Sequence, residues 1–327
     1  MRGNRPTDPE WAASLKPGWQ LERMENFDAI VNGGIVDNDM VKDGWTDILH
    51  KLLARGKPTD DPMKAAADRQ IADFEKMEQV RARASEIVKD PATAESLKPW
   101  YNQLCKRPCF HDQYLHAFNK PNVKLIDTKG KGVTDITEKG IVANGEEFEV
   151  DCIIYATGFE LATQVSHRWN ATLHGRNGKT LDEKWSDGAR TLHGWTIRDF
   201  PNCFLLSVVQ AALSPNFLHV TGEQAKHLAY VIKTANERNI QTIEPTEEAE
   251  EKWTETIVEL GKLRAAFLKE CTPGYYNNEG LPASMAAARS GTYGAGSPAF
   301  YKVLRDWRSK DDFEGLDVTY MPEKARV

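Results

Sequence analysis

Residues 151–159, Asp-Cys-Ile-Ile-Tyr-Ala-Thr-Gly-Phe, constrain the fold of this chain more than any other stretch. Bulky apolar residues give way abruptly to the small residues Ala156, Thr157 and Gly158. An apolar run that ends in a glycine turn predicts a buried strand, and in open α/β sheets such a strand end borders the ligand crevice. Taken alone, the pattern also fits an ordinary strand and turn. It favours an α/β fold in which backbone atoms meet a ligand beyond the strand.

The residues before this strand predict a β-hairpin. Residues 140–150 form two short runs separated by Asn144-Gly145, a dipeptide that favours a tight two-residue turn. Further strands are expected over residues 122–127 and over the apolar run 204–209. The middle of the chain therefore predicts strands.

Helices are expected on both sides of these strands. In the first hundred residues, apolar side chains recur at steps of three and four. They are Met63, Ala67, Ile71, Phe74 and Met77. A helix over 223–238 carries the stripe Ala225, Leu228, Ala229, Ile232 and Ala235. Another begins near Thr246, a good N-cap followed by acidic residues that suit the helix dipole. Its stripe is Ala249, Trp253, Ile257, Leu260 and Phe267. We interpret all three stripes as faces packed on a core.

Composition and charge argue against several classes of protein. A formal net charge of −6 over 327 residues argues against nonspecific nucleic-acid binding. No run of about eighteen apolar residues predicts a transmembrane helix, and the first residues lack the apolar core of a secretory signal, so we expect a cytoplasmic protein. The Cys109–His111 gap is too short for a zinc-finger loop, and no metal site is expected. Ser214 lacks the G-x-S-x-G turn of a hydrolase.

Several segments, in order, resemble the C-terminal portion of the Baeyer–Villiger monooxygenases, which are class B flavoprotein monooxygenases. The hairpin with the Ala-Thr-Gly strand resembles a late segment of that family. Residues 105–123, with Lys-Arg-Pro at their start, resemble its K-R-P…Y…F-N…N-V segment. Residues 200–202 and 271–280 are similar to its flavin-reaching stretch and its C-terminal tail. The resemblance covers nearly the whole chain.

The resemblance implies an α/β fold: a partial two-dinucleotide-binding-domain flavoprotein fold with a helical module at the N-terminus. Residues 1–100 would form an insertion-like helical module. Residues 101–160 would be the returning part of the NADPH-binding domain, and residues 161–327 the C-terminal part of the FAD-binding domain. The G-x-G-x-x-G turns that anchor FAD and NADPH in the family do not occur in the chain.

A lysine–arginine pair of the family stands here at Lys106 and Arg107. By resemblance, Lys106 would neutralise the 2′-phosphate of NADPH, a task that suits a compact ammonium. Arg107 would be catalytic, because a guanidinium near the flavin stabilises negative charge during oxygen transfer. From the residues alone, a basic pair on the surface is the alternative.

Further cofactor contacts are implied at two places. Ala156, Thr157 and Gly158 would lie at the junction of the two nucleotide domains, close to bound cofactor. Gln210 and Asn216 could donate hydrogen bonds to a flavin edge, although a plain loop between strand and helix is an equal alternative. The chain has Val208-Val209-Gln210 where better-known members have a Gly-Pro run, which leaves the substrate class open.

The function that this resemblance implies is a flavin- and NADPH-dependent conversion of a ketone to an ester or lactone, with FAD and NADPH as cofactors. The substrate would be a small hydrophobic ketone. A complementary N-terminal half or a homo-oligomer would complete the enzyme. The alternatives are a flavin-free protein that keeps the substrate cavity, as a metabolite-binding protein, isomerase or cyclase, and an inactive remnant.

Overall fold

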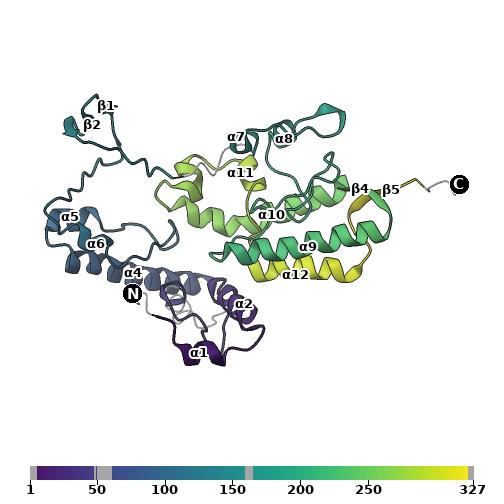
Figure 1. Cartoon of the computed structure of the whole chain (residues 1–327), viewed down its shortest axis with the longest axis horizontal. Coiled ribbons are helices and arrows are strands. Elements are labelled where there is room, and N and C mark those ends of the chain that lie inside the picture. Colours follow the sequence, from purple (N-terminus) through teal and green to yellow (C-terminus); the bar gives the residue numbers. More distant parts are fainter. Residues whose placement is uncertain (1–5, 48, 50–60, 159–164, 323–327) are drawn as a thin grey trace. The chain divides into compact units, whose positions relative to one another are not determined.

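The computed structural model describes residues 6–47, 49, 61–158 and 165–322, and it divides the chain into two compact units (Figure 1). Unit 1 comprises Met1–Pro6 and Lys51–Leu161, and unit 2 comprises Thr7–His50 and Ala162–Val327. The first hundred residues are therefore divided between the two units. Helix α2 (Trp19–Val31) belongs to unit 2, and its buried face is tied to residues 186 to 273 positions later, as described below.

Unit 1 is built on the long helix α4 (Pro62–Ile87), followed by the short helices α5 (Pro91–Ser96) and α6 (Tyr114–Ala117). Helices α4 and α5 each begin at an Asp-Pro pair, in which the aspartate accepts hydrogen bonds from first-turn amides and proline sits at the first helical position. Local sequence thus fixes where both helices start.

The prediction of which face of α4 is buried is wrong. Met63, Ile71 and Phe74 are 81%, 45% and 57% exposed, and of the expected stripe only Met77 is buried. The buried face instead contains Ala72, Asp73, Met77 and Ala84. Small side chains and a carboxylate face the interior because the segment that packs there brings polar backbone groups, which need hydrogen-bond partners.

The β-hairpin of unit 1 is confirmed. Strand β2 (Gly140–Ala143) pairs antiparallel with β3 (Glu146–Glu149) and with the short β1 (Asp135–Ile136). Asn144 and Gly145 connect β2 and β3 with φ of 54° and 81°. Positive φ at both turn residues is what a two-residue hairpin turn requires, so the Asn-Gly signal was sufficient here.

Two further strands expected in unit 1 are not formed. Residues 122–127 and 152–158 are not paired in any strand, and Ile154 and Tyr155 are 85% and 70% exposed. An apolar run has side chains that suit a buried strand, but a strand also needs a neighbouring strand whose backbone groups are free to form hydrogen bonds with it. Within the described residues neither segment has such a neighbour. Phe159 lies outside the described residues.

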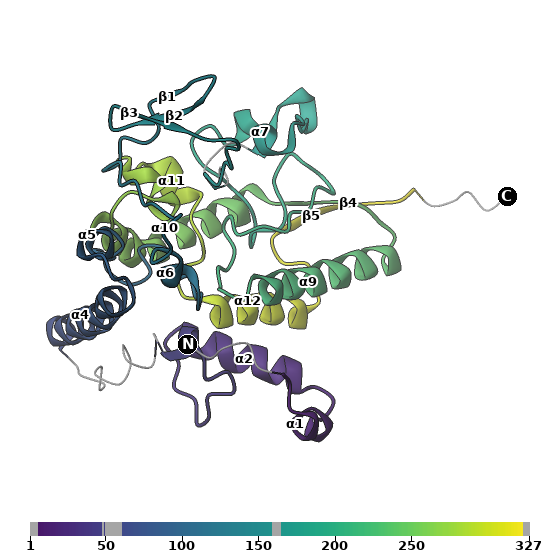
Figure 2. The ribbon, with the colours of Figure 1, turned by 60° about the vertical axis from the view of Figure 1, so that its left-hand side comes forward.

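Unit 2 begins with α1 (Pro9–Ser14) and α2, and continues after residue 164. Its smaller helices are α7 (Val165–Trp169), η1 (Arg176–Gly178), α8 (Leu181–Lys184), η2 (Tyr275–Gly280) and α11 (Met285–Arg289). Its larger helices are α9 (Phe217–Glu237), α10 (Glu247–Lys269) and α12 (Ser297–Lys310). Strands β4 (Ile240–Pro245) and β5 (Leu316–Tyr320) pair antiparallel. Helices α9 and α12 lie side by side in both views (Figure 2).

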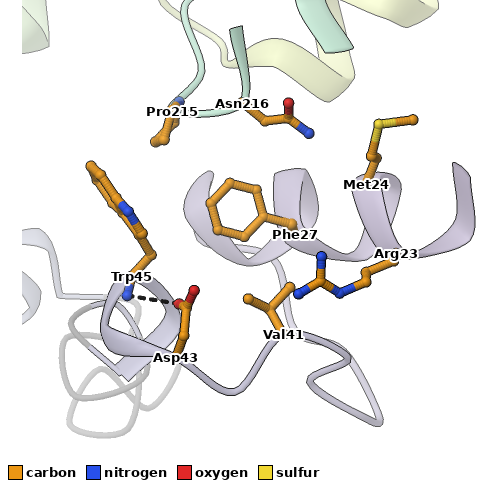
Figure 3. A pocket seen from close by; sticks show the side chains of 8 residues that line it. All are labelled: Arg23, Met24, Phe27, Val41, Asp43, Trp45, Pro215 and Asn216. Atoms are coloured by element: carbon orange, nitrogen blue, oxygen red, sulfur yellow. Dashed lines mark hydrogen bonds between the residues drawn. The ribbon is translucent and has the colours of Figure 1, made fainter. Parts of the chain in front are cut away.

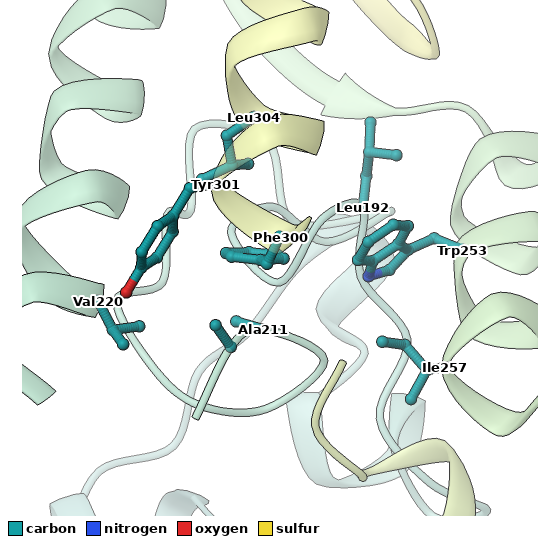
Figure 4. Close-up of a cluster of buried hydrophobic side chains, with 9 residues drawn as sticks. Leu192, Ala211, Val220, Trp253, Ile257, Phe300, Tyr301 and Leu304 are labelled. Carbon is teal, nitrogen blue, oxygen red and sulfur yellow. The ribbon is translucent and has the colours of Figure 1, made fainter. Parts of the chain in front are cut away.

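The core of unit 2 lies where α9, α10 and α12 meet the loop before α9 (Figure 4). Its buried members are Leu192, Ala211, Ala212, Val220, Trp253, Ile257, Phe300, Tyr301 and Leu304. The stripe expected on α10 is confirmed, since Trp253 and Ile257 are buried and its other members are half-buried. Thr246 caps that helix by accepting a hydrogen bond from Ala249 N.

The stripe expected on α9 is only partly correct: Ala225, Ala229 and Ile232 are exposed, whereas Leu228 is half-buried and Ala235 is buried. The buried face of α9 is largely polar and includes His219, Glu223, Gln224 and His227. The strand expected over 204–209 is reduced to one bridge between Phe204 and Thr196.

The expected mixture of helix and strand is confirmed, but the expected partial nucleotide-binding sheet is not. Both sheets of the described residues are small and antiparallel. The runs that were expected to supply strands of a larger sheet are unpaired or reduced to one bridge. Among the described residues, no helix combines the length and the apolar character that a membrane span requires.

Candidate functional site

The lysine–arginine pair follows a segment that α4 holds in place. The buried carboxylate of Asp73 accepts a hydrogen bond of 2.8 Å from Gln103 N, and Gln70 donates to the Asn102 side chain at 3.4 Å. Burial raises the pKa of Asp73, while the Gln103 hydrogen bond and the nearby Arg81 oppose that shift. The buried carboxylate of Asp73 on α4 therefore fastens this segment.

Arg81 completes the attachment from the next turns of α4. Its guanidinium donates to Pro99 O at 3.1 Å and lies 4.5 Å from the centre of the Trp100 ring. Four residues beyond the attachment at Asn102, the Lys106 ammonium lies 5.7 Å from the centre of the Tyr101 ring, and Arg107 is exposed. Two adjacent cations thus stand at the surface of unit 1 on an anchored loop.

The second part of the expected site, residues 156–158, also lies in unit 1. Ala156, Thr157 and Gly158 are exposed and lie outside any helix or strand, and Gly158 has φ of +89°. A Cβ at Gly158 would meet no heavy atom within 4 Å. Glycine is therefore required here for its backbone conformation, and the space beside it is open to a ligand.

Gln210 lies in unit 2, and its side chain is used within the protein. The residue is fully buried, and its amide nitrogen donates to Ala189 O at 2.7 Å and to Arg289 O at 2.8 Å. Its amide oxygen accepts from Thr191 Oγ1 at 2.7 Å. Both amide hydrogens are therefore engaged by backbone carbonyls. This geometry favours a structural role, so we leave Gln210 out of the cofactor contacts proposed below.

Asn216 caps α9 and borders a hollow in unit 2 (Figure 3). The hollow has a volume of about 320 Å³. It is lined by Arg23, Met24, Phe27, Val41, Asp43, Trp45, Pro215 and Asn216. Carbon-rich side chains of Phe27, Trp45 and Pro215 face one another across it, and Arg23 stands at one side. A hollow lined by aromatic and aliphatic groups with a few polar ones is suited to a largely apolar small molecule.

Sequence reasoning missed a buried polar cluster beside this hollow. Asp28, which is 1% exposed, accepts hydrogen bonds from Ser214 Oγ at 2.5 Å, His219 Nδ1 at 2.6 Å and Tyr301 OH at 3.1 Å. The partners lie between 186 and 273 residues from Asp28 in the sequence, so no local spacing could have revealed them. Ser214 bonds to a carboxylate, not to a histidine, so the cluster lacks the order of a hydrolase triad.

No protein-family model matches the chain. Among curated proteins, the Baeyer–Villiger monooxygenase ATR8 of Stachybotrys chlorohalonatus is 48% identical over 322 residues, which cover 97% of this chain and 52% of that protein. The solved structure of a polycyclic ketone monooxygenase from Thermothelomyces thermophila superposes with a TM-score of 0.84 at 37% identity, over 97% of this chain and 53% of the other. By sequence and by fold, this chain is a relative of the Baeyer–Villiger monooxygenases.

This relationship confirms the resemblance drawn from the K-R-P segment and the Ala-Thr-Gly run. A further solved relative, OTEMO in complex with FAD and NADP, is 25% identical with a TM-score of 0.64, over 76% of this chain and 45% of that one. The chain spans about half the length of the Baeyer–Villiger monooxygenases that it matches. The structure describes two separate parts of the expected site, one in each unit.

The residues of unit 1 fit the chemistry of a dinucleotide. Lys106 and Arg107 offer positive charge for phosphate, and residues 156–158 offer exposed backbone with open space beside Gly158. Within the described ranges, no group of three or more histidine, cysteine or acidic residues could hold a metal ion. The exposed groups of this part of the site are thus suited to an anionic organic cofactor.

Proposed function

We propose that this chain supplies part of a flavin- and NADPH-dependent Baeyer–Villiger monooxygenase that converts a hydrophobic ketone to an ester or lactone. The observation that carries the proposal is the Lys106–Arg107 pair, placed on an anchored loop in a chain that is 48% identical to ATR8 over nearly its whole length. Because the chain spans half of that relative, the activity is proposed for the assembled protein and not for the chain by itself. A complementary polypeptide half or a second copy of the chain would complete it.

The two cations have different tasks in this proposal. Lys106, a compact ammonium, would neutralise the 2′-phosphate of NADPH. Arg107, whose planar guanidinium offers several hydrogen-bond donors, would stabilise negative charge that develops during oxygen transfer. When FAD and NADPH are bound, they supply the reducing equivalents and the oxygen activation, which no side chain of the protein can provide.

The remaining residues would orient the ligands. The backbone of Ala156, Thr157 and Gly158 would contact a cofactor, because small residues allow close approach. Asn216 would face the flavin or the ketone from the rim of the hollow in unit 2. The apolar groups around that hollow favour a hydrophobic ketone over a charged substrate, since burying a charge without a partner is costly.

The test is the substitution Arg107→Ala in an assembled enzyme. This chain would replace the matched stretch of ATR8, so that the chimera contains every segment that ATR8 has. Formation of ester from a polycyclic ketone would be followed by mass spectrometry, and consumption of NADPH by absorbance. Arg107→Ala should abolish ester formation, because the developing charge loses its guanidinium.

Arg69→Ala is the matched control, since Arg69 is another exposed arginine of unit 1, on α4. Its ester formation should equal that of the unsubstituted chimera. Ester formation that persists in Arg107→Ala would refute the catalytic role of Arg107. A separate measurement, the visible absorbance of the purified chain after addition of FAD, shows whether the chain alone holds flavin.

A further inference from the structure

The buried carboxylate of Asp28 joins α2 to three other parts of unit 2 at one point. Asp28 lies on α2, Ser214 in the loop before α9, His219 in the first turn of α9 and Tyr301 on α12. All four are at most 4% exposed. Each partner can donate one hydrogen, and the carboxylate accepts all three hydrogen bonds.

One branch of this cluster reaches the hollow. Ser214 Oγ donates to Asp28 Oδ1 and at the same time accepts a hydrogen bond of 3.1 Å from Asn216 N. Asn216 and Pro215 line the hollow, and Phe27, the residue before Asp28, lines its opposite side. The distance between the two walls is therefore set by a chain of two hydrogen bonds that runs from α2 to the loop.

The other branch holds Asp28 itself in place. Tyr301 donates to Asp28 Oδ2, and burial, followed by the negative charge of Asp28, raises the pKa of the phenol, which therefore remains a donor. One turn further along α2, Asn32 donates to Ser297 Oγ at 3.0 Å and accepts from Ser297 N at 3.2 Å. Helix α2 is thus fixed on α12 independently of the loop.

We propose that Asp28 is a positioning residue that acts through Ser214 to hold residues 213–216 in the conformation that binds the ketone. The inference rests on the proposed function, because it assigns the hollow to that substrate. A carboxylate is suited to this task because its oxygens accept from every partner. An amide at residue 28 would turn one hydrogen-bond donor toward Ser214, His219 or Tyr301 and break the arrangement.

The experiment compares two substitutions that each remove one hydroxyl from the same carboxylate. Ser214→Ala removes the branch to the loop, and Tyr301→Phe removes the branch to α12. Both delete one buried hydrogen bond to the Asp28 carboxylate, and Ser214→Ala also removes the acceptor of Asn216 N, so we expect Tm to decrease in both variants and at least as much in Ser214→Ala. Asp28→Asn is the third variant and should disturb both branches.

Two measurements on the purified full chain then separate positioning from stability. The first is hydrogen–deuterium exchange of the amides of residues 213–219, read by mass spectrometry. The second is binding of prodan, a hydrophobic aromatic ketone whose emission shifts to the blue in apolar surroundings. In Ser214→Ala, and in Asp28→Asn, where Asn216 N keeps Ser214 Oγ as its acceptor, we expect amide exchange over residues 213–219 to accelerate and prodan binding to weaken, each by about tenfold or more, because a hydrogen bond to a charged group is lost.

In Tyr301→Phe both quantities should remain within about twofold of the unsubstituted chain, because Asn32 still fixes α2. If Ser214→Ala and Tyr301→Phe changed amide exchange and prodan binding equally, unit 2 would be loosened in general and the proposal would be overturned. The proposal would also be overturned if Ser214→Ala left both quantities unchanged. If the unsubstituted chain binds no prodan, the proposed ketone site fails, and the exchange comparison alone still decides whether Asp28 positions the loop.

Discussion

The side-chain amide of Gln210 gives the sharpest test of which loop residues serve the fold and which serve a ligand. Gln210→Met keeps a long unbranched side chain but removes the amide. Thr254 Oγ1 still donates to Glu250 O, and Thr191 Oγ1 still accepts from Gly194 N but loses the acceptor of its own hydrogen. The carbonyls of Ala189 and Arg289 lose this donor. At about 1–3 kcal/mol for each buried group left unpaired, the two carbonyls alone should lower the free energy of unfolding by roughly 2–6 kcal/mol.

Urea unfolding followed by tryptophan fluorescence measures this loss, since Trp253 Nε1 donates to Gln210 O and reports on the same site. Gln210→Glu is the isosteric control. Its ionised carboxylate would face two carbonyl oxygens with no hydrogen to donate, so this variant should be less stable than Gln210→Met. A loss below about 1 kcal/mol in Gln210→Met would refute the reasoning, because it would mean that the buried amide contributes no net hydrogen bonds.

Two further predictions concern the hairpin and the acid stability. Gly140→Ala should disrupt the β2–β3 pairing, because a Cβ would lie 1.9 Å from Phe148 O. Faster hydrogen–deuterium exchange of the amides of residues 140–149 would show this disruption. An exchange rate equal to that of the unsubstituted chain would contradict the close approach. Burial lowers the pKa of His193 to about 4 and that of His227 to about 3. Between about pH 6.5 and 4, the unfolded chain therefore binds protons that these two histidines do not bind in the native protein. The free energy of unfolding should consequently decrease as the pH is lowered through that window. His193→Phe should flatten this dependence in urea titrations at several pH values, and an unchanged slope would exclude His193 as a source.

Local chemistry determined what could be predicted from the sequence. Asn144-Gly145 fixed a hairpin turn, and Thr246 with the stripe of Trp253 and Ile257 gave the start and the buried face of α10. Each of these signals acts within a few residues, so neither required knowledge of a distant partner. The K-R-P segment was recognisable for the same reason.

The errors have a common physical cause in long-range pairing. The run 152–158 has the apolar composition of a strand, but within the described residues it lacks a neighbour for its backbone. On α9 the buried face includes His219 and Gln224, whose hydrogen bonds reach Asp28 and Ser207 O, beside the apolar Val220 and Val231, so aliphatic periodicity alone did not reveal it. Asp28 could not be singled out, because a single aspartate in a helix is most often solvated.

The same long-range cluster determines the order in which parts of this protein can fold during synthesis on the ribosome. Asp28 and Tyr301 are separated by 273 residues, and Asn32 and Ser297 by 265. At a synthesis rate of about 5–20 residues per second, α2 emerges roughly 15–55 s before the helix that covers its buried carboxylate. During that interval Asp28 stays hydrated and α2 has no packed partner on α12. Unit 1, which apart from Met1–Pro6 comprises the intervening stretch Lys51–Leu161, is synthesised before α12. In the nascent chain, α2 therefore remains undocked and can pack on α12 only when synthesis is nearly complete.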